Sequence, residues 1–587
     1  MKKSALFVLS LMLLITAFLA GCSDKTANPT PTTTTAPVES VATSAPTPTP
    51  KPEGPQPGGT ITYGFTQPFK GVFDPAWYGG EDDSLVLGFM ADSFFKTGDD
   101  LKTYPNLAEW KESADHKVFT FSIKKGVKWH NGDELTVEDW KFALEVIASK
   151  EYTEAKGSRY SNVEMIQGVE EYRDGKAKEI SGIKVIDPYT IEITVKEAAV
   201  NTLDNLWNYP MNKKYFTGVA IKDMPNSDQV RKNPIGLGPF KVKKIQPGEF
   251  VELVRNDDYW QGKPLLDGVV YKVVDGALAT SLLEKGEIDI MQIPNSQYKD
   301  VEKLANVEIK KEPSLSFSYI GFKLGKWDKK NEKIVVDPKS KFADKKLRQA
   351  MYYSLDRQGL IDAFSNGLGV PVSVPMPTVS WAMVPTDQIN NYAYDPDKAK
   401  KMLDEAGYKD INGDGMREDP QGKKLTINFD AMSGSEIAEP RAQAIIQMFR
   451  EVGLDVKLNG GALKEMNTFY DLVENDDPSV ELFMGAWIMA SDPDPSGLWR
   501  SNDFWNFPRW FTPESEKLIS EGIGEKAFDQ NYRKQVYADW QKIVNEEVPM
   551  MYLNAPIDVN VINKRLQGVH TNSFGNQTDV HKWWVKQ

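Results

Sequence analysis

The sequence predicts an α/β or α+β protein of more than one lobe, and three observations support this fold class. The chain has 587 residues, which is long enough for several domains. Alternation of apolar and polar residues predicts half-buried strands, as at 119–123 and 191–195. Apolar residues at helical spacing predict amphipathic helices, as at 140–147 and 532–543. Both patterns in one chain predict helices layered on sheets.

Start and stop signals place these elements more closely. Thr136 and Asp139 have the spacing of a capping box, so a helix is expected directly after Thr136. Asp395-Pro396 supplies a cap and a first-turn proline for another helix. Apolar stretches at 240–245 and 250–254 flank a Gln-Pro-Gly turn, which predicts a strand pair.

The stretch Glu481–Arg500 combines an apolar run with a constrained turn. Leu482–Met489 has the length of a buried strand, and Asp492-Pro493-Asp494-Pro495 follows it. Each proline biases the aspartate before it away from helical backbone. A strand that ends on two acids and Trp499 suits a ligand site. A core strand followed by an ordinary loop explains the same spacing equally well.

Composition and motifs exclude several classes of function. The net charge of −13 disfavours nucleic acid and anionic membrane surfaces as partners. None of the four histidines has a partner at zinc-site spacing. The chain contains no Gly-x-Ser-x-Gly elbow and no phosphate-binding loop. No cofactor is required by any motif, although the 83 acidic residues leave a carboxylate-pair hydrolase open.

The N-terminal region predicts export and anchoring. Residues 1–21 have the charged start and apolar run of a secretory signal, and the run is short for a membrane span. Small residues precede Cys22, the single cysteine, and the junction resembles a bacterial lipobox, which implies lipidation of Cys22. A plain cleavage site with a chance cysteine is the alternative. Residues 22–57 are rich in proline and threonine, which predicts an extended linker.

One loop has the start of a calcium-binding pattern. Asp410, Asn412 and Asp414 stand at its first, third and fifth positions, and Gly415 follows. The twelfth position holds Gln421, where a bidentate glutamate is expected. The sequence therefore offers a structural calcium site, with a metal-free turn of Asn, Asp and Gly as the alternative.

Many segments resemble, in order, the bacterial extracellular solute-binding proteins of family 5, the oligopeptide- and dipeptide-binding components of ABC importers. These segments are Asn106–Trp110, Phe119–Phe121, Gly126–Gly132, Glu171-Tyr172, Ile183–Asp187, Asn233–Phe240, Asn256–Trp260, Lys345–Arg357 and Trp540–Pro549. The resemblance covers nearly all of residues 58–587. It implies a two-lobe periplasmic-binding-protein-like fold of class II, cluster C type, with an extra subdomain in the first lobe.

The resemblance also implies a division of the chain. Lobe I is expected to comprise residues 58–100, 234–325 and 551–587, with the extra subdomain at 101–233. Lobe II is expected at 326–550. Proteins of this kind close on a ligand by rotation about a hinge.

Two segments match the stretches that contact ligand in this family. The expected contacts are Trp77, Tyr78, Gly79, Gly80, Glu81, Ala486, Trp487, Ile488, Asp492 and Asp494. In peptide-binding members an acid after the second stretch pairs with the ligand's ammonium group, and Asp492 is the first choice here, before Asp494. Arg441, Arg500 and Arg509 are candidates for holding a peptide carboxylate.

These observations predict a monomeric lipoprotein that captures oligopeptides and delivers them to an ABC permease without performing chemistry. It is expected on the extracytoplasmic face of the cell membrane of a Gram-positive bacterium, held there by its lipid alone. An oligosaccharide ligand is the nearest alternative, because the chain contains 15 tryptophans. A surface-anchored hydrolase and a sensor that presents ligand to a signalling partner are the alternatives from other classes.

Overall fold

The structure is a computed structural model that describes residues 54–586. The expected signal peptide, Cys22 and most of the expected linker at 22–57 lie outside the described residues. Within the part that is described, no helix is long and apolar enough to cross a membrane.

One sheet section is built around the first strand of the described chain. Its strand order is β11-β1-β10-β9-β8, with β1 parallel to β10 and the β8–β9 pair antiparallel. The strands are β1 (Thr60–Phe65), β8 (Phe240–Gln246), β9 (Phe250–Arg255), β10 (Gly268–Val273) and β11 (Ile290–Ile293). Helix α1 (Glu81–Met90) packs on this section through Phe89, whose ring lies 5.7 Å from that of Tyr63. The predicted strand pair at 240–254 is confirmed.

A separate four-stranded sheet, in the order β4-β5-β7-β6, lies within the expected extra subdomain. Its strands are β4 (Ala108–Glu112), β5 (Val118–Ile123), β6 (Ile183–Asp187) and β7 (Thr190–Thr194). Helix α2 (Val137–Ala148) begins at the predicted capping box, in which the Asp139 carboxylate accepts the Thr136 N–H at 3.0 Å. Trp140 of α2 packs against Phe121 of β5, with ring centroids 4.8 Å apart.

A second sheet section has the order β18-β17-β19-β13, in which β17 is parallel to both β18 and β19. Its strands are β13 (Ser316–Phe322), β17 (Thr426–Asp430), β18 (Asp455–Leu458) and β19 (Leu482–Ile488). The helices of this region are α9 (Lys345–Tyr353), α10 (Arg357–Ser365), α11 (Pro396–Glu405), α12 (Ala438–Glu451), α13 (Met466–Glu474), α14 (Pro513–Glu521) and α15 (Gln530–Glu547). Asp395 caps α11 as predicted, since its carboxylate accepts the Lys398 N–H at 2.9 Å.

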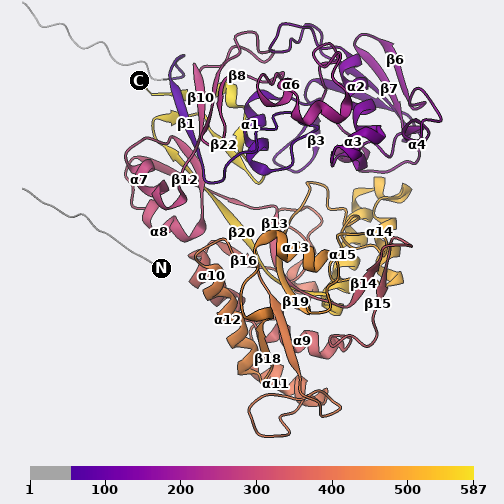
Figure 1. Cartoon of the computed structure of the whole chain (residues 1–587), viewed down its shortest axis with the longest axis vertical. Coiled ribbons are helices and arrows are strands. Elements are labelled where there is room, and N and C mark those ends of the chain that lie inside the picture. Colours follow the sequence, from indigo (N-terminus) through magenta and orange to yellow (C-terminus); the bar gives the residue numbers. More distant parts are fainter. Residues whose placement is uncertain (1–53, 587) are drawn as a thin grey trace, which may run out of the picture. The chain divides into compact units, whose positions relative to one another are not determined.

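Strand β20 (Met550–Asn563) belongs to both sheet sections (Figure 1). Its first residues pair with β13, and the residues from Ile557 onward pair with β12 (Val307–Pro313) and β11. The chain also passes from β12 to β13 through Ser314 and Leu315, so two strand segments connect the sections. The expected division into lobes stays a prediction, and this strand pairing favours a boundary at 314–315 in place of 325–326.

Short elements complete the described chain. The two-stranded ribbons pair β2 (Phe95–Thr97) with β3 (Thr103–Pro105), β14 (Gly325–Asp328) with β15 (Lys333–Val336), β21 (Leu566–Gln567) with β24 (Trp584–Val585), and β22 (His570–Asn572) with β23 (Gly575–Thr578). Strand β16 (Gly369–Pro371) adds to β20. The short helices are α3 (Lys150–Glu154), α4 (Val169–Arg173), α5 (Thr202–Asn205), α6 (Asp228–Arg231), α7 (Ala279–Glu284) and α8 (Tyr298–Val301).

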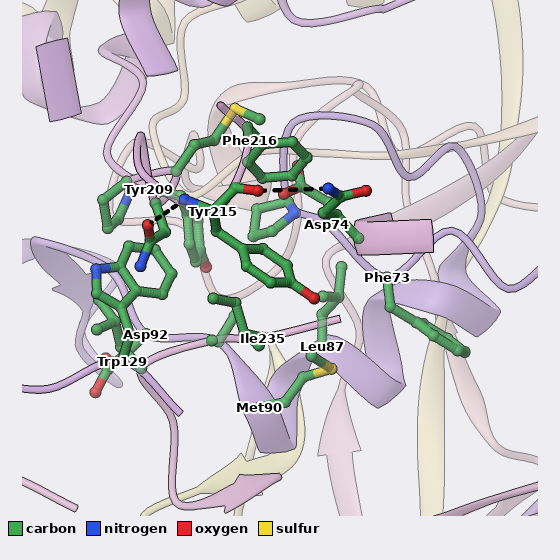
Figure 2. A pocket seen from close by; sticks show the side chains of 18 residues that line it. Phe73, Asp74, Leu87, Met90, Asp92, Trp129, Tyr209, Tyr215, Phe216 and Ile235 are labelled. Atoms are coloured by element: carbon green, nitrogen blue, oxygen red, sulfur yellow. Dashed lines mark hydrogen bonds between the residues drawn. The ribbon is translucent and has the colours of Figure 1, made fainter. Parts of the chain in front are cut away.

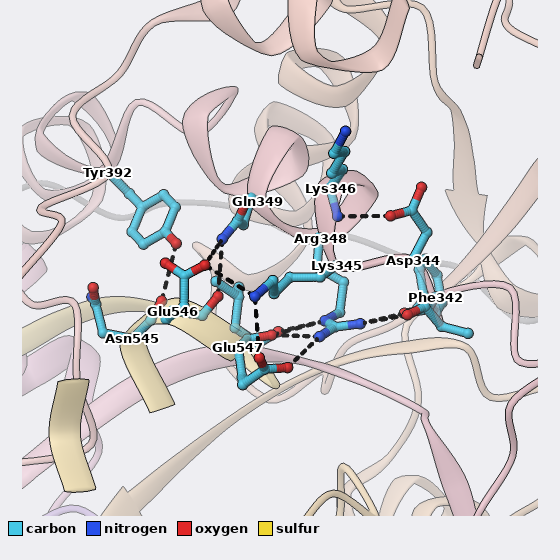
Figure 3. A network of polar contacts seen from close by, with 12 residues as sticks. Phe342, Asp344, Lys345, Lys346, Arg348, Gln349, Tyr392, Asn545, Glu546 and Glu547 are labelled. Atoms are coloured by element: carbon cyan, nitrogen blue, oxygen red, sulfur yellow. Dashed lines mark hydrogen bonds and ion pairs between the residues drawn. The ribbon is translucent and has the colours of Figure 1, made fainter. Parts of the chain in front are cut away.

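A buried arginine fastens α9 to the end of α15, directly before β20 (Figure 3). The Arg348 guanidinium donates to the carbonyl oxygens of Glu547 at 3.0 Å and of Phe342 at 2.7 Å. It also donates to the Val548 carbonyl at 3.1 Å. The last carbonyls of a helix have no partner within the helix. Arg348 supplies those partners and so fixes the point where β20 begins.

Candidate functional site

A cavity of about 860 Å³ lies beside helix α1 and the end of strand β19. Its wall is formed by Pro75, Tyr78, Ser84, Leu87, Gly88, Ala91, Asp92, Ser93, Arg159, Asn162, Asp204, Leu206, Trp207, Asn208, Tyr209, Ile488, Met489, Ala490 and Gln577. Helix α1 packs on the first sheet section, whereas β19 belongs to the second. The cavity is therefore a cleft between the two sections, and its volume is in the range of ligand sites.

A much smaller cavity of about 20 Å³ adjoins this cleft and shares Leu87, Asp92 and Tyr209 with it (Figure 2). Space of this size holds about one water molecule. Asp74 lines it, and burial raises the pKa of the Asp74 carboxyl to about 7. The same carboxylate accepts the Ala76 N–H at 2.9 Å, so Asp74 shapes the turn before α1. This cavity is a packing space beside the ligand-sized cleft.

The first predicted stretch meets the cleft through Tyr78. Trp77 is buried and packs on the ring of Tyr152 at 4.6 Å, so it supports the wall from behind. Gly79 and Gly80 precede α1, and Glu81 is its first residue. Burial, and then the neighbouring Asp82, raise the pKa of Glu81.

The second predicted stretch meets the cleft through Ile488, whose side chain is 78% exposed although it is large and apolar. Ala486 is exposed as well. Successive side chains of a strand point to opposite faces. Trp487 accordingly points to the other face, where its ring stacks on Phe507 at 5.5 Å. The structure thus brings Tyr78 and Ile488 to one cavity and places both tryptophans behind its walls.

Both predicted aspartates have partners within the protein. Arg533 of α15 donates to the two carboxylate oxygens of Asp492 at 2.6 and 2.7 Å. Asp494 accepts from Asn201 Nδ2 at 2.9 Å and from the Ser496 hydroxyl at 2.7 Å. Burial raises the pKa of Asp494. A buried carboxylate needs a cation, and Arg533 supplies that cation to Asp492.

The three candidate arginines differ in their surroundings. Arg509 is fully buried and pairs with Asp476, 2.8 Å away, so it is committed to the interior. Arg441 and Arg500 form no ion pair with any residue in 54–586. Burial alone lowers the pKa of Arg441.

The side chains of the calcium-like loop accept hydrogen bonds from the loop's own backbone. Asp410 accepts the N–H groups of Gly413 at 2.7 Å and Gly415 at 2.9 Å, while Asn412 accepts the N–H of Asp414 at 2.8 Å. The described residues contain no group of three or more acidic, histidine or cysteine side chains arranged to hold a metal. Calcium at this loop stays a prediction.

Several residues of the cleft wall were not predicted by any sequence motif. Arg159 and Asp204 come from the extra segment between α3 and β8, and Gln577 comes from a C-terminal ribbon. The cleft-facing acid Asp204 lies on α5, a helix of one turn. Sequence patterns identify long regular elements, whereas these residues lie on a turn, a short helix and a short ribbon whose positions depend on tertiary packing.

Comparison with known proteins agrees with this architecture. Residues 102–507 match the model for bacterial extracellular solute-binding proteins, family 5 Middle. The chain is 30% identical to the oligopeptide-binding protein AppA of Bacillus subtilis over 594 aligned residues, which cover 100% of this chain and 99% of AppA. It is 30% identical to the oligopeptide-binding protein OppA of Lactococcus lactis, over 84% of this chain and 82% of that one.

Solved structures give the same result. The structure of Bacillus subtilis AppA in complex with a nonapeptide has a TM-score of 0.72 at 28% identity, over 91% of this chain and 100% of AppA. Lactococcal OppA, complexed with an endogenous peptide in the closed conformation, has a TM-score of 0.76 at 28% identity, over 87% of this chain and 97% of OppA. The predicted two-lobe fold is confirmed. Its cleft, its shared central strand and its sequence together show that the chain belongs to the bacterial extracellular solute-binding proteins of family 5.

Proposed function

We propose that this protein captures oligopeptides in the cleft and releases them to the permease of an ABC importer. The observation that carries the proposal is the 860 Å³ cavity between Tyr78 and Ile488, on a fold shared with relatives solved in complex with peptides. The protein acts by binding alone. Lipid attachment at Cys22 places it on the extracytoplasmic face of the membrane, as a monomer.

Strand β19 offers a means of holding a peptide backbone. Its first residues pair with β17 through Leu482 and Phe483, whereas β13 pairs with it all the way to Ile488. Among the strands of residues 54–586, the outer edge from Met484 to Ile488 therefore has no partner. An extended peptide can add to such an edge by main-chain hydrogen bonds, which do not depend on the peptide's sequence.

Closure of the cleft accompanies binding in this proposal. Two contacts already cross between the expected extra subdomain at 101–233 and the region of β19 and α15. The His116 ring stacks on Phe528 with a centroid distance of 3.8 Å, and Asn201 donates to Asp494 at 2.9 Å. Rotation about Ser314-Leu315 and the middle of β20 would break and remake these contacts.

Ligand titration tests the proposal. Calorimetry with a mixed set of nonapeptides is expected to show binding, whereas xylo- and cello-oligosaccharides are expected to show none. A free peptide concentration of about 100 times the dissociation constant adds about 2.7 kcal/mol to the free energy of unfolding, so thermal unfolding gives a second readout. If the calorimeter records binding of oligosaccharides and none of peptides, the oligosaccharide alternative replaces the peptide proposal. Peptide turnover by the pure protein would favour a hydrolase.

The ammonium role of Asp492 needs its own experiment, because Arg533 already neutralises that carboxylate. If Asp492 holds a free N-terminus, Asp492→Asn weakens free-amine peptides much more than their N-acetylated forms. The bidentate pair favours the opposite outcome, in which both forms weaken equally. Asp174→Asn, in an exposed ion pair outside the cavity wall, is the matched control.

A further inference from the structure

The cleft wall carries three ionisable side chains, and they differ in the hydrogen bonds and ion pairs that the protein offers them. These are Asp92, Arg159 and Asp204. Asp92 accepts from Trp260 Nε1 at 2.8 Å, from the Tyr259 hydroxyl at 3.1 Å, and from the side chain of Asn106. Its hydrogen-bonding capacity is therefore met by neutral donors of the protein itself.

Asp204 has fewer hydrogen-bond partners than Asp92. Its one side-chain hydrogen bond comes from the Thr103 hydroxyl at 2.5 Å, and it forms no ion pair among residues 54–586. The charges that act on it across the cleft are Asp492 and Arg533, and Arg533 is committed to Asp492 by two hydrogen bonds. Burial and the charge of Asp492 raise the pKa of Asp204 to about 6. The carboxylate is exposed to the cavity, and no cation among residues 54–586 lies within ion-pair distance of it.

Arg159 is the positive counterpart. Its guanidinium lies 4.6 Å from the centre of the Tyr78 ring, and it donates to the Tyr78 carbonyl at 3.3 Å. Its Nε is buried and has no hydrogen-bond partner in the described residues. No carboxylate in that part of the chain lies within ion-pair distance of it. Tyr78 thus holds the guanidinium in place while its charge stays available to the cavity.

We propose that Asp204 and Arg159 set the charge preference of the ligand, with a cationic side chain of the peptide against Asp204 and an anionic side chain against Arg159. This inference rests on the proposed peptide-binding function. Closing the cleft removes water from both groups. An unpaired charge in such a site is costly, whereas a partner of opposite charge forms a charge-assisted hydrogen bond.

Single-substitution peptide sets test the inference. One set places a single Lys, or the neutral norleucine, at each position of an alanine-based nonapeptide, so that no register needs to be assumed. A second set uses Glu and Gln in the same way. Because hydrogen bonds to charged groups contribute about 1.5–3 kcal/mol, the wild-type protein is expected to bind the best Lys and Glu peptides about 10-fold to 100-fold more tightly than their neutral counterparts.

Variants then assign the two preferences. Asp204→Asn is expected to abolish the Lys preference and keep the Glu preference, and Arg159→Gln is expected to do the reverse. Asp223→Asn, at an exposed acid outside the cavity wall, is expected to keep both. A cooperative thermal unfolding transition is the check that each variant is folded. The affinity difference between charged and neutral peptides is measured on the wild-type protein and therefore does not depend on any variant.

The outcomes separate the two proposals. Binding of charged and neutral peptides with equal affinity by the wild-type protein overturns the charge inference and leaves peptide binding intact. Variants that weaken charged and neutral peptides alike overturn it as well. If no peptide in either set binds, the peptide-binding function fails, and the charge inference falls with it.

Discussion

Arg533 and Asp492 form a bidentate ion pair in which both side chains are nearly buried, with exposed fractions of 5% and 9%. The pair joins α15 to the segment after β19, in which Met489 and Ala490 line the cleft. Asp492 follows Trp487 closely in the chain, yet its partner lies 41 residues away. The cleft wall is therefore fixed by a charge contact between distant segments.

Removing one member of this pair is expected to destabilise the protein strongly. Arg533→Met leaves the buried Asp492 carboxylate without its cation, which costs about 3–5 kcal/mol in comparable pairs. Urea unfolding followed by circular dichroism measures the change. Lys176→Met, in a pair whose side chains are 70% and 52% exposed, is expected to cost less than about 1 kcal/mol. Equal losses for both substitutions would show that the bidentate pair contributes no more than a surface contact.

Replacing Arg348 is expected to destabilise the protein about as much as replacing Arg533, for a different reason. Arg348→Met removes the donors for the carbonyls of Phe342, Glu547 and Val548. A buried acceptor left without a donor costs about 1–3 kcal/mol, so a loss of about 3–5 kcal/mol in the free energy of unfolding is expected. Lys346→Met, at an exposed site on the same helix, is the control and should change it by less than about 0.5 kcal/mol. A small effect of Arg348→Met would mean that other donors reach these carbonyls.

Gly236 is expected to tolerate no side chain. A Cβ at this position would lie 1.8 Å from the Met90 carbonyl oxygen, and that oxygen belongs to the backbone at the end of α1. Gly236→Ala must displace α1 and is expected to lower the free energy of unfolding by about 2 kcal/mol or more. At Gly79 a Cβ would have no neighbour within 4 Å, so Gly79→Ala should be almost neutral in the same unfolding assay. A stable Gly236→Ala variant with unchanged ligand affinity would contradict this expectation.

His130 is expected to make the protein less stable as the pH falls. Its Nδ1 accepts the Gly236 N–H at 3.0 Å, and its Nε2–H donates to the Gly238 carbonyl at 3.0 Å, so the ring is neutral. Burial lowers the pKa of His130 from 6.5 to about 4. Between these values the unfolded chain binds a proton that the folded protein does not. Stability is complete above the unfolded pKa and falls by up to about 1.4 kcal/mol per pH unit below it.

The comparison with His130→Gln isolates this contribution. Asp74 acts in the opposite direction, since burial raises its pKa, but it acts equally in both proteins. The difference in unfolding free energy between wild type and variant should therefore shrink as the pH is lowered from 6.5 to 4. A difference that is constant over this range would show that His130 titrates normally.

Local patterns were sufficient for most regular elements. The alternation at 119–123 predicted β5, and the Thr136–Asp139 box predicted the start of α2. Asp395-Pro396 predicted the start of α11. These signals act within one or two turns of the chain, so they are readable without tertiary contacts.

The site depended on contacts that local patterns do not encode. Trp487 and Ile488 are both large and apolar, so the alternation of β19 gave no sign of which one faces the cleft. The partner of Asp492 and the cavity position of Asp204 follow from packing between distant segments. Family resemblance predicted the stretches, and the structure was needed to orient their side chains.

The placement of β20 has a consequence for the order in which the protein is made. Every other strand of the twelve-stranded sheet precedes β20 in the chain, yet β20 lies in the middle of that sheet. A ribosome delivers the N-terminal segments first. Both sheet sections therefore remain incomplete until residue 563 has been synthesised, and the chain keeps unpaired strand edges, which can pair wrongly with other chains, until the last strand is present.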